Sequence, residues 1–498
     1  MRQTDPLVRE PLEAVYTLSQ IRDLEQAICA SRGIGMPALM QQAGEAVYAF
    51  FAERQPEAMA TKVFCGAGHN GGDAWVFAYH AHQQGKQVTV VSMIALAALS
   101  GDVAEVAKAY VNAGGVYAVW PEVGDTACDW VVDGLLGIGA SGAVRAPYDA
   151  AVVFMQSLKA PVLAIDVPTG LDAETGAVHE PCVKADITAT LLGLKWGLVT
   201  GEALNYVGDL QLLPLHDAKA LSFSKHALAY RLRHGRMVLP KRQNNSHKGD
   251  YGRVLLIGGM NGMTGAICLA AEAAARVGAG YVQVSSQSCY LSEVLASKWD
   301  FLLLPLEDDA ALAHALDQTA AVLIGPGLGQ GDLAKQVLAR VLGCKKPLVV
   351  DADALSLLAQ SPCKLDNGII TPHPGEAGRL LGQSTEWVQS HRKLAIEMLT
   401  ERYGAHVVLK GAGTLMLGPE SDLRVSGCGN PGMAVAGMGD VLGGMIAGFL
   451  AQGLTLGQAK VMGVMNHAGL SDSLVGQLGE SGLMASDLLP HLGRWVDP

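Results

Sequence analysis

The sequence predicts an α/β protein with two domains, each built around a parallel β-sheet. The first observation is length, because 498 residues exceed what one ordinary hydrophobic core supports and two domains of roughly 150–250 residues are expected. The second is composition, since 50% hydrophobic and 17% charged residues describe a compact globular chain. The third is a repeated pattern of apolar run, glycine turn and helical stretch, which is typical of parallel strands covered on both faces.

In the first half, this pattern begins at Thr61 with TKVFCGAGHNGGDAWVFAYHAHQQGKQVTVVSM, which predicts strand, turn, helix and strand. The runs CDWVVDGLLGIGA and APVLAIDVPTGLD predict two further buried strands, each ending in an aspartate. Ligands of such sheets bind beyond the carboxyl ends of the strands. Five residues fall at predicted strand ends and are therefore expected at a site: Gly68, Asn70, Asp73, Asp133 and Asp166.

Residues 216–250 break the pattern, because they are polar, basic and proline-containing. We predict the domain boundary in the first part of this stretch, with one domain over residues 1–220 and the other over residues 226–498. The pattern restarts at Tyr251 with YGRVLLIGGMNGMTGAICLAAEAAARVGAGYVQVSS. It continues through AAVLIGPGLG, KPLVVDADALSLLA, NGIITPHPGEAGRLL and AHVVLKGAGTLML, so the second half is a second α/β domain.

Charge and composition argue against several classes of partner. The net charge of −11 offers no basic surface for nucleic acid or an anionic membrane. The first residues lack the apolar segment of a signal peptide, and no apolar run reaches the ~20 residues of a membrane helix. Nine scattered cysteines indicate reduced thiols. We therefore expect a cytoplasmic protein with small-molecule substrates, and a homo-oligomer of unspecified size.

Four predicted strand-end loops in the second half carry polar chemistry. LIGPGLG contains Gly325, Gly327 and Gly329, ITPHPGEAG contains His373 and Glu376, VVLKGAGT contains Lys410, and GNPGMAVAGMGDVLGG contains Asp440. Any one of these loops could be a purely structural turn, and Asp440 could be a simple helix N-cap. Together they predict a nucleotide-phosphate site, because bare glycine amides at a helix start bind phosphate oxygens. A helix N-terminus also predicts a lowered pKa for Asp440, which would leave it ionised at neutral pH.

GMGD resembles the GxGD signature of the ribokinase-like superfamily, in which the aspartate accepts the proton of the attacking hydroxyl. The set NSHKGDYGRVLLIGG, TGA, GPGLG, DADAL, TPHPGE, KGAGT and GNPGMAVAGMGDVL is more narrowly similar to the ADP/ATP-dependent NAD(P)H-hydrate dehydratase family. The resemblance implies a ribokinase-like domain that phosphorylates hydrated NADH or NADPH and eliminates phosphate. It implies hydrate contacts by Ala266, Gly327, His373 and the catalytic Asp440, and nucleotide contacts by Lys410, Gly411, Ala412, Gly413, Thr414 and Gly439. Glu376 lies where the superfamily acid arranges Mg²⁺; Asp351 and Asp353 either lie near the metal or form a structural turn.

The first half combines oxygen-bearing side chains with bare backbone at neighbouring strand ends. Carbonyl, carboxylate and hydroxyl oxygens without imidazole or thiolate suit a hard cation. The alternative is a set of turns closed by short polar side chains. GAGHNGGDAW, GLLGIGA and DVPTG resemble motifs of the NAD(P)H-hydrate epimerase family, which implies a Rossmann-like doubly wound domain. His69, Ala74 and Thr169 differ from the family pattern, but Thr169 keeps the hydroxyl of the usual serine.

By that resemblance, Asn70, Asp133 and Thr169 hold K⁺, and Asp166 is the acid/base group that interconverts the R and S hydrates. The implied substrate contacts are His69, Asn70, Gly71, Gly72, Asp73, Gly137, Ile138, Gly139, Ala140, Ser141, Gly142, Ala143 and Asp166. The whole chain thus resembles a bifunctional enzyme that repairs hydrated NADH and NADPH, with Mg²⁺ and ADP expected as donor and ATP as the alternative. The other hypothesis is a small-alcohol kinase fused to a non-catalytic domain that binds a nucleotide or a protein partner.

Overall fold

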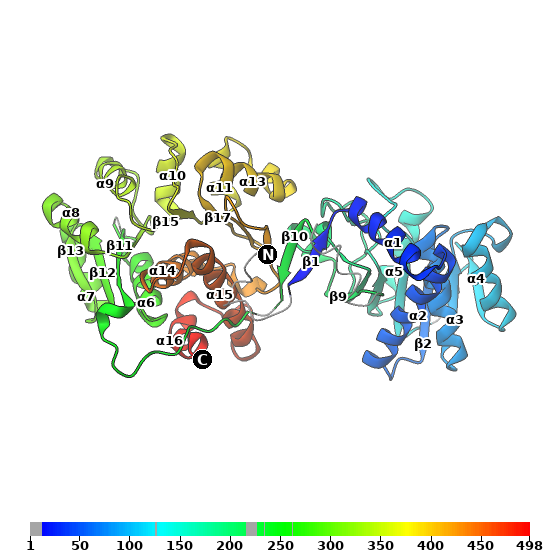
Figure 1. Ribbon diagram of the computed structural model, residues 1–498. Helices are drawn as coiled ribbons and strands as arrows, with labels where there is room; N and C mark the ends of the chain where they lie inside the picture. The colour runs from blue at the N-terminus through cyan, green and yellow to red at the C-terminus, as the bar shows by residue number, and fades with distance from the viewer. Residues whose placement is uncertain (1–11, 125–126, 216–226, 234, 261) are drawn as a thin grey trace. The chain divides into compact units, whose positions relative to one another are not determined.

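The computed structural model describes residues 12–124, 127–215, 227–233, 235–260 and 262–498. The chain divides into two compact units: Ala14–Ala229 is called the N-terminal unit, and Tyr230–Pro498, which groups with Glu13, is called the C-terminal unit. Each unit combines a mainly parallel sheet with covering helices, which confirms the predicted fold class (Figure 1). The boundary predicted between residues 220 and 226 lies outside the described residues. In the described part of the chain, no helix has both the length and the apolar character needed to span a membrane.

The N-terminal unit follows the strand–turn–helix order expected from its sequence. Its elements are β1 (Glu13–Tyr16), α1 (Leu18–Arg32), α2 (Met36–Arg54), β2 (Ala60–Cys65), α3 (His69–Gln83), β3 (Gln87–Ser92), α4 (Gly101–Asn112), β4 (Val116–Val119), β5 (Trp130–Gly134), α5 (Tyr148–Ser157), β6 (Val162–Ile165), β7 (Ile187–Leu191), β8 (Leu194–Lys195) and β9 (Asp209–Leu213).

Seven strands of this unit form one sheet in the order β4-β3-β2-β5-β6-β7-β9, and all their pairings are parallel. The order reverses between β2 and β5, which makes this pair the topological switch point where doubly wound sheets open a crevice for ligands. β1 and β8 pair in parallel outside this seven-stranded sheet, with Val15 opposite Leu194. The loops after β2, β5 and β6 therefore end on the same edge of the sheet.

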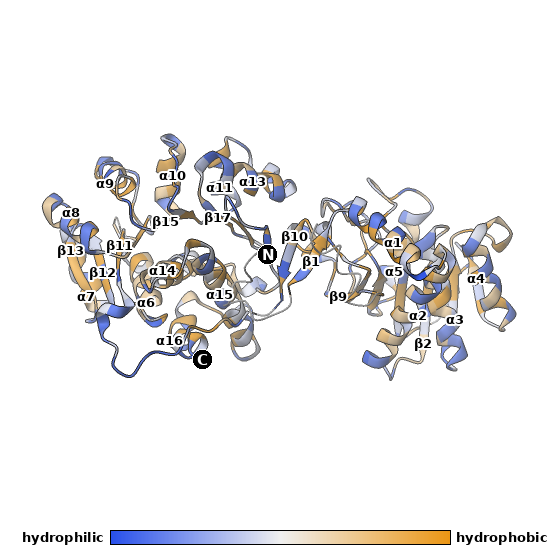
Figure 2. Cartoon of the chain, in the orientation of Figure 1, coloured by the Kyte–Doolittle hydropathy of each residue, from blue (hydrophilic) through white to orange (hydrophobic). Residues whose placement is uncertain are grey.

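Alternate residues of these strands enter two different cores, one on each face of the sheet. Val63 and Cys65 of β2 pack with α2, α3 and α4, whereas Phe64 between them packs with α5. Because both faces are covered, the strands read as continuous apolar runs, as the sequence predicted. Apolar residues of the sheets and helix faces stand out in Figure 2.

The C-terminal unit begins with a strand that the sequence did not predict. Its elements are β10 (Ala229–Leu232), β11 (Arg253–Ile257), α6 (Thr264–Arg276), β12 (Tyr281–Ser286), α7 (Leu291–Ser297), β13 (Leu302–Pro305), α8 (Asp309–Gln318), β14 (Ala321–Ile324), α9 (Asp332–Leu342), β15 (Leu348–Val350), α10 (Ala352–Gln360), β16 (Gly368–Ile370), α11 (Pro374–Leu381), α12 (Thr385–Ser390), α13 (Arg392–Tyr403), β17 (His406–Leu409), β18 (Leu415–Leu417), β19 (Arg424–Ser426), α14 (Met438–Ala451), α15 (Leu456–Leu478) and α16 (Ala485–Val496). β10 lies within the polar stretch 216–250 that breaks the predicted pattern, where four residues are too few to show a strand pattern.

The strands of this unit follow the order β13-β12-β11-β14-β15-β16-β17-β18-β19-β10. Pairing is parallel from β13 to β17, antiparallel across β17, β18 and β19, and parallel between β19 and β10. The strand order reverses between β11 and β14. Helices α6, α14 and α15 pack on one face, and α8 and α13 contact the sheet from the other (Figure 1).

Glycines of α14 let this helix approach α6 very closely. A Cβ at Gly444 would lie 2.1 Å from the Ala270 carbonyl oxygen, and one at Gly448 would lie 2.9 Å from that of Ala274. A side chain at either position would force the helices apart. The GGMIAG run therefore serves helix packing, while the preceding GMGD segment lies at the helix N-terminus.

Candidate functional site

Helix α3 starts earlier than the sequence suggested. The segment expected to be a loop, His69–Asp73, forms the first turns of α3, and Gly68 is the N-cap. Asn70 and Asp73 are both buried there. Ala74, where the family pattern has glycine, is accommodated because residue 134 is a glycine: a Cβ at Gly134 would lie 2.3 Å from the Ala74 Cβ. The altered HNGGDA sequence thus keeps a tightly packed helix start.

Asn70, Asp133 and Thr169 come together at the switch point of the N-terminal sheet. The Asp133 carboxylate accepts hydrogen bonds from the Leu135 N–H at 3.1 Å, and from the Thr169 N–H and Oγ1 at 2.8 Å each. The Leu136 N–H donates to Thr169 Oγ1 at 3.1 Å, and Asn70 Nδ2 donates to the Leu136 carbonyl at 3.1 Å. Three side chains far apart in sequence therefore form one oxygen-rich cluster.

The cluster has the chemistry of a monovalent cation site. Asn70 Oδ1 is buried and has no hydrogen-bond partner in the described part of the chain, which leaves an oxygen available to a cation. Burial raises the pKa of Asp133 to about 6, although hydrogen bonds from Thr169 and Leu135 oppose that shift. A nearby positive charge would favour the ionised form. These residues therefore fit K⁺, as the resemblance implies.

Asp166 follows β6 and adopts a left-handed backbone conformation, with φ of 66°. Its Oδ1 accepts hydrogen bonds from the Leu191 N–H at 3.0 Å, from Thr190 Oγ1 at 3.3 Å and from Lys195 Nζ. Strained backbone of this kind persists only where its surroundings hold it, and it clusters at functional sites. Asp166 is thus locked in place by the β7–β8 segment.

Lys195 was not among the predicted site residues. Its Nζ contacts Thr190 Oγ1 at 3.0 Å and the Leu191 carbonyl at 2.7 Å besides Asp166, and the residue is only 1% exposed. The sequence signal was present, because Lys195 is the lone charge in the apolar run LLGLKWGL. Buried lysines are rare unless they are paired.

Asp166, Lys195, Asn70 and Asp73 line a pocket of about 820 Å³. Glu25 of α1 lies in the same pocket and was also missed by the sequence interpretation. Burial, followed by the Asp166 and Glu25 charges, raises the pKa of Asp73 well above its ordinary value. The pKa of Glu25 is raised by burial and then by Asp166, with Lys195 opposing. The pocket therefore gathers three carboxyl groups around one lysine.

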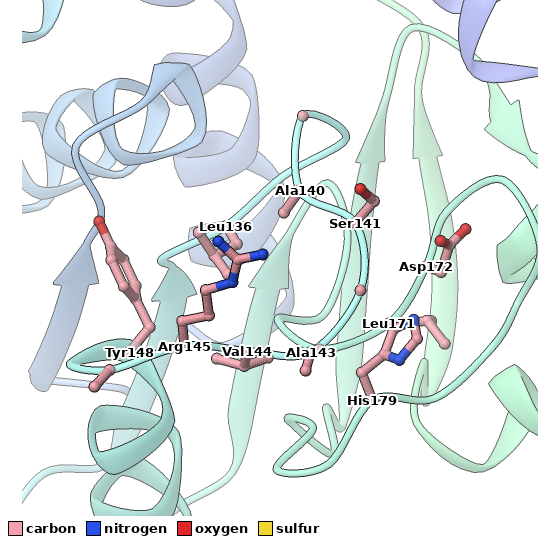
Figure 3. A pocket seen from close by; sticks show the side chains of 14 residues that line it. Leu136, Ala140, Ser141, Ala143, Val144, Arg145, Tyr148, Leu171, Asp172 and His179 are labelled. Carbon is pink, nitrogen blue, oxygen red and sulfur yellow. The ribbon is translucent and has the colours of Figure 1, made fainter.

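The segment from Gly137 to Ala143 separates this pocket from a second one. Gly137 to Ala140 line the large pocket, whereas Ser141 to Ala143 line a cavity of about 380 Å³ together with Arg145 and His179. Figure 3 shows Arg145 and Tyr148 at one end of that cavity and His179 and Asp172 at the other. Only the first four of the seven predicted loop residues therefore face the Asp166 pocket.

In the C-terminal unit, strand-end loops converge on Lys410. Its Nζ lies 3.0 Å from Asp351 Oδ1 and 3.7 Å from Glu376 Oε2, and a Cβ at Gly439 would lie 3.3 Å away. Burial lowers the pKa of Lys410, but the Asp351, Glu376 and Asp440 carboxylates outweigh burial and raise it above the ordinary lysine value. The lysine predicted to bind phosphate is therefore held among carboxylates and stays charged.

Asp440 is the third residue of α14, whose N-cap is Gly437 with φ of 90°. The simple N-cap interpretation is thus wrong. The prediction of a lowered pKa is also wrong, because burial and the charge of Asp351 raise the pKa of Asp440 to about 7, with Lys410 opposing. The cost of burial and of neighbouring carboxylates outweighs the helix N-terminus, whose effect is typically 0.3–1 kcal/mol, or about one pKa unit at most.

His373 and Glu376 cap helix α11 reciprocally. His373 Nδ1 accepts hydrogen bonds from the N–H groups of Gly375 at 3.0 Å and Glu376 at 3.4 Å, and the His373 N–H donates to Glu376 Oε2 at 2.7 Å. Burial, followed by the charges of Lys410 and Arg379, lowers the pKa of His373. The ring is therefore neutral at pH 7 and offers its Nε2–H as a donor.

The remaining predicted positions lie around the same edge of the sheet. Ala266 is in the first turn of α6, one turn before Leu269, whose side chain would meet a Cβ at Gly437 at 2.6 Å. The Gly327 carbonyl accepts a hydrogen bond from the Met260 N–H at 2.6 Å, which joins the loops after β14 and β11. Asp353, in the first turn of α10, accepts from the Gly329 N–H at 2.8 Å, whereas Asp351 pairs with Lys410.

In the described part of the chain, no group of three His, Cys, Asp or Glu side chains has a metal-binding arrangement. Around Lys410, however, three carboxyl groups (Asp351, Glu376 and Asp440) share one ammonium, and the pKa values of Glu376 and Asp440 are raised. This excess of acidic groups fits a divalent cation arriving with a nucleotide, because a cation would relieve their mutual repulsion.

Comparisons with known proteins find relatives of both units. The family profile described as NAD(P)H-hydrate dehydratase matches residues 254–492, and that of the YjeF-related protein N-terminus matches residues 37–197. A bifunctional NAD(P)H-hydrate repair enzyme of Coxiella burnetii is 41% identical over 98% of this chain and 100% of that protein. The Escherichia coli protein of the same description is 38% identical over 97% of this chain and 94% of that protein.

A crystal structure described as ADP/ATP-dependent NAD(P)H-hydrate dehydratase from Bacillus subtilis, co-crystallised with ATP and Mg²⁺, is also similar. It is 29% identical, with a TM-score of 0.47, and the match covers 52% of this chain and 94% of that chain. The full-length relatives decide the assignment, because their identity extends over both units. This chain belongs to the family of bifunctional NAD(P)H-hydrate repair enzymes.

Proposed function

We propose that this protein restores NADH and NADPH from their hydrates, with one activity in each unit. The N-terminal unit interconverts the R and S hydrates, and the C-terminal unit dehydrates the S hydrate at the expense of an adenine nucleotide. The observation that carries the proposal is the half-buried Asp440 at the start of α14, beside the Lys410–Asp351 pair, in a chain that aligns with repair enzymes over nearly its full length. We place the protein in the cytoplasm, as a homo-oligomer.

In the dehydratase, the hydroxyl oxygen of the hydrate attacks the terminal phosphorus of the nucleotide, and Asp440 takes the proton of that hydroxyl. The bond from that phosphorus to the bridging oxygen breaks, and the shortened nucleotide leaves. The ring nitrogen then expels inorganic phosphate from the carbon that carried the hydroxyl, and loss of a proton from the adjacent carbon restores the double bond. A base with a pKa of about 7 suits the first step, since half of it is ionised at neutral pH.

The other residues position the reactants of this step. The amides at the start of α14, including that of Gly439, point toward the transferring phosphoryl group, and residues 410–414 hold the nucleotide. The neutral His373 donates a hydrogen bond to the hydrate, with Ala266 and Gly327 completing the contact. Glu376 is the residue that would arrange Mg²⁺, which when bound neutralises phosphate charge. We propose ADP as the donor.

In the epimerase, Asp166 moves a proton to and from the hydrate hydroxyl as that group leaves one face of the ring and water returns to the other. The hydrogen bonds from Thr190, Leu191 and Lys195 all reach Oδ1, so we assign the proton transfer to Oδ2. Lys195 fixes the carboxylate and supplies positive charge. Asn70, Asp133 and Thr169 would hold K⁺, which when bound contributes a positive charge beside the substrate.

The test is recovery of dihydronicotinamide absorbance from a mixed R and S hydrate preparation, with ADP and ATP supplied separately. The wild-type protein should convert both epimers, whereas Asp166→Asn should stop once the S epimer is consumed. Accumulation of a stable phosphorylated product without reduced nicotinamide would instead support the small-alcohol kinase. Complete conversion by Asp166→Asn, at the wild-type rate, would show that the N-terminal unit does not epimerise through this carboxylate.

A further inference from the structure

We propose that Arg392 is a positioning residue for nucleotide binding, acting through the backbone of the loop from Lys410 to Thr414. This inference rests on the proposed dehydratase function of the C-terminal unit. Arg392 is the first residue of α13 and is 3% exposed, so its guanidinium lies inside the protein. It matches none of the motifs that resemble the family, and the sequence pattern gave no reason to place it near the loop.

The guanidinium of Arg392 binds both ends of the loop turn. Nη1 donates to the Lys410 carbonyl at 3.3 Å, and Nη2 donates to the carbonyls of Leu409 and Lys410 at 3.4 Å each and of Gly413 at 3.3 Å. Gln389 Oε1 of α12 accepts a hydrogen bond from Nη1 at 3.1 Å and so helps to fix the orientation of the guanidinium. One rigid group therefore ties the strand end to the far side of the turn, across about twenty residues of chain.

The loop sequence is matched to this cation. Gly411 has φ of 122°, and a Cβ at this position would lie 3.0 Å from Arg392 Nη1. A side chain at residue 411 would therefore both strain the backbone and press on the guanidinium. The glycine needed for close phosphate approach is also the glycine that the buried arginine requires.

Binding these carbonyls has an electrostatic consequence for a bound nucleotide. A phosphate oxygen is repelled by a carbonyl oxygen and attracted by an N–H group or a cation. Arg392 keeps three carbonyl oxygens of the loop on its own side, and it places a permanent positive charge beneath the loop. Burial lowers the pKa of Arg392 only to about 10, so the group stays protonated at neutral pH. Removing it should weaken nucleotide binding more than hydrate binding.

The experiment compares Arg392→Met and Arg392→Lys with the wild type in the full-length protein, using ADP as the titrant. Arg392→Met should raise the KM for ADP about tenfold, because it removes both the hydrogen bonds that hold these carbonyls and the positive charge beneath the loop. Arg392→Lys, which keeps the charge but loses the fork, should give a smaller rise. The KM for the S hydrate and the epimerase rate should stay at wild-type values.

The matched control is Lys393→Met, on the next residue of α13, whose ammonium pairs with Glu397 at 2.8 Å. It should leave the KM for ADP unchanged. An unchanged KM for ADP in Arg392→Met, or equal losses in ADP and hydrate parameters, would overturn the inference. If Arg392→Met fails to fold, Arg392→Lys provides the test. Its KM for ADP should rise while its KM for the S hydrate stays at the wild-type value. Dehydration by the wild type shows independently that the proposed function stands, so the two failures are distinguishable.

Discussion

The two units share a strand order and differ in what surrounds it. Counted from β2 and from β11, both sheets follow the order 3-2-1-4-5-6-7, and in both the fifth strand is followed by an aspartate paired with a lysine. Asp166 pairs with Lys195 in one, and Asp351 with Lys410 in the other. In each site three carboxyl groups surround the lysine. The same scaffold thus supports two chemistries that its strands alone do not distinguish.

The difference lies in the loops and in exposure. Lys195 is held by Asp166, Thr190 and Leu191 and its side chain is 1% exposed, whereas the side chain of Lys410 is 20% exposed. The N-terminal pocket adds amide and hydroxyl oxygens that suit K⁺. The C-terminal site adds the open start of α14 and a glycine loop, which suit phosphate oxygens. The two sites therefore differ in the ligands that their loops suit.

The largest effect should come from Asp440→Asn, which removes the proposed proton acceptor of the C-terminal unit. The rate of dehydration should fall by about 10²–10⁴-fold, the range that a positioned acid or base contributes. ADP binding and epimerisation should persist, because neither uses this carboxylate. Single-turnover assays with the S hydrate measure the loss. Near-wild-type turnover would show that Asp440 is not the proton acceptor.

Replacing each lysine by methionine compares the two ion pairs directly. Lys195→Met should destabilise the N-terminal unit by about 3–5 kcal/mol, the usual cost of leaving a buried charge without its partner. Lys410→Met should destabilise the C-terminal unit less, since Lys410 is more exposed. Calorimetric transitions of each unit, with added ADP used to identify the C-terminal one, measure both changes. A larger loss for Lys410→Met would reverse the comparison.

Asn70→Ala should affect only the unit with the oxygen cluster. Loss of the Oδ1 ligand should lower the epimerisation rate about 10–100-fold and raise the K⁺ concentration needed for half activity, in line with losses seen for metal-site substitutions. Turnover of the S hydrate should be unchanged. Titration with K⁺ at fixed substrate gives the readout, and equal losses of both activities would indicate misfolding or coupling between units.

The smallest effect at neutral pH is a pH dependence specific to dehydration, because kcat at pH 7 should be about half its plateau value. Because Asp440 must be ionised to accept a proton and its pKa is raised to about 7, kcat should rise about tenfold per pH unit below pH 7 and level off above it. The stability of the folded C-terminal unit has the opposite pH dependence, because it should decrease as the pH rises. The folded pKa lies above the unfolded value of about 3.9, so ionisation destabilises the folded unit as pH rises from about 4 to 7.

Asp440→Asn checks that sign. Its thermal transition for the C-terminal unit should lie above that of the wild type at pH 8, and the gain should shrink as the pH falls toward 4 and disappear below it, where Asp440 becomes protonated in both states. A gain that is independent of pH would show that the carboxyl is not the source. Thermal unfolding of the wild type and of Asp440→Asn at several pH values measures this gain in transition temperature.

Much of the fold and of both sites was predictable because the relevant signals are local. Apolar runs bounded by glycines located β2, β5 and β6, and an aspartate at the start of an apolar helix located Asp440. Strand-end logic also brought Asn70, Asp133 and Thr169 together, since parallel strands end on one edge of a sheet. Strand β10 was not predicted, because four residues of mixed polarity are too few to show an alternating pattern.

By itself, the sequence determined the two parallel sheets, the strand-end loops and the identity of the groups that end there. Tertiary structure alone decided which of those groups are paired, buried or charged. Lys195 reaches Asp166 across 29 residues of chain, and Arg392 reaches the Lys410 carbonyl across 18. The pKa of Asp440 moved opposite to expectation for the same reason. Local sequence determines where a helix begins, whereas desolvation and neighbouring charges depend on packing between distant segments.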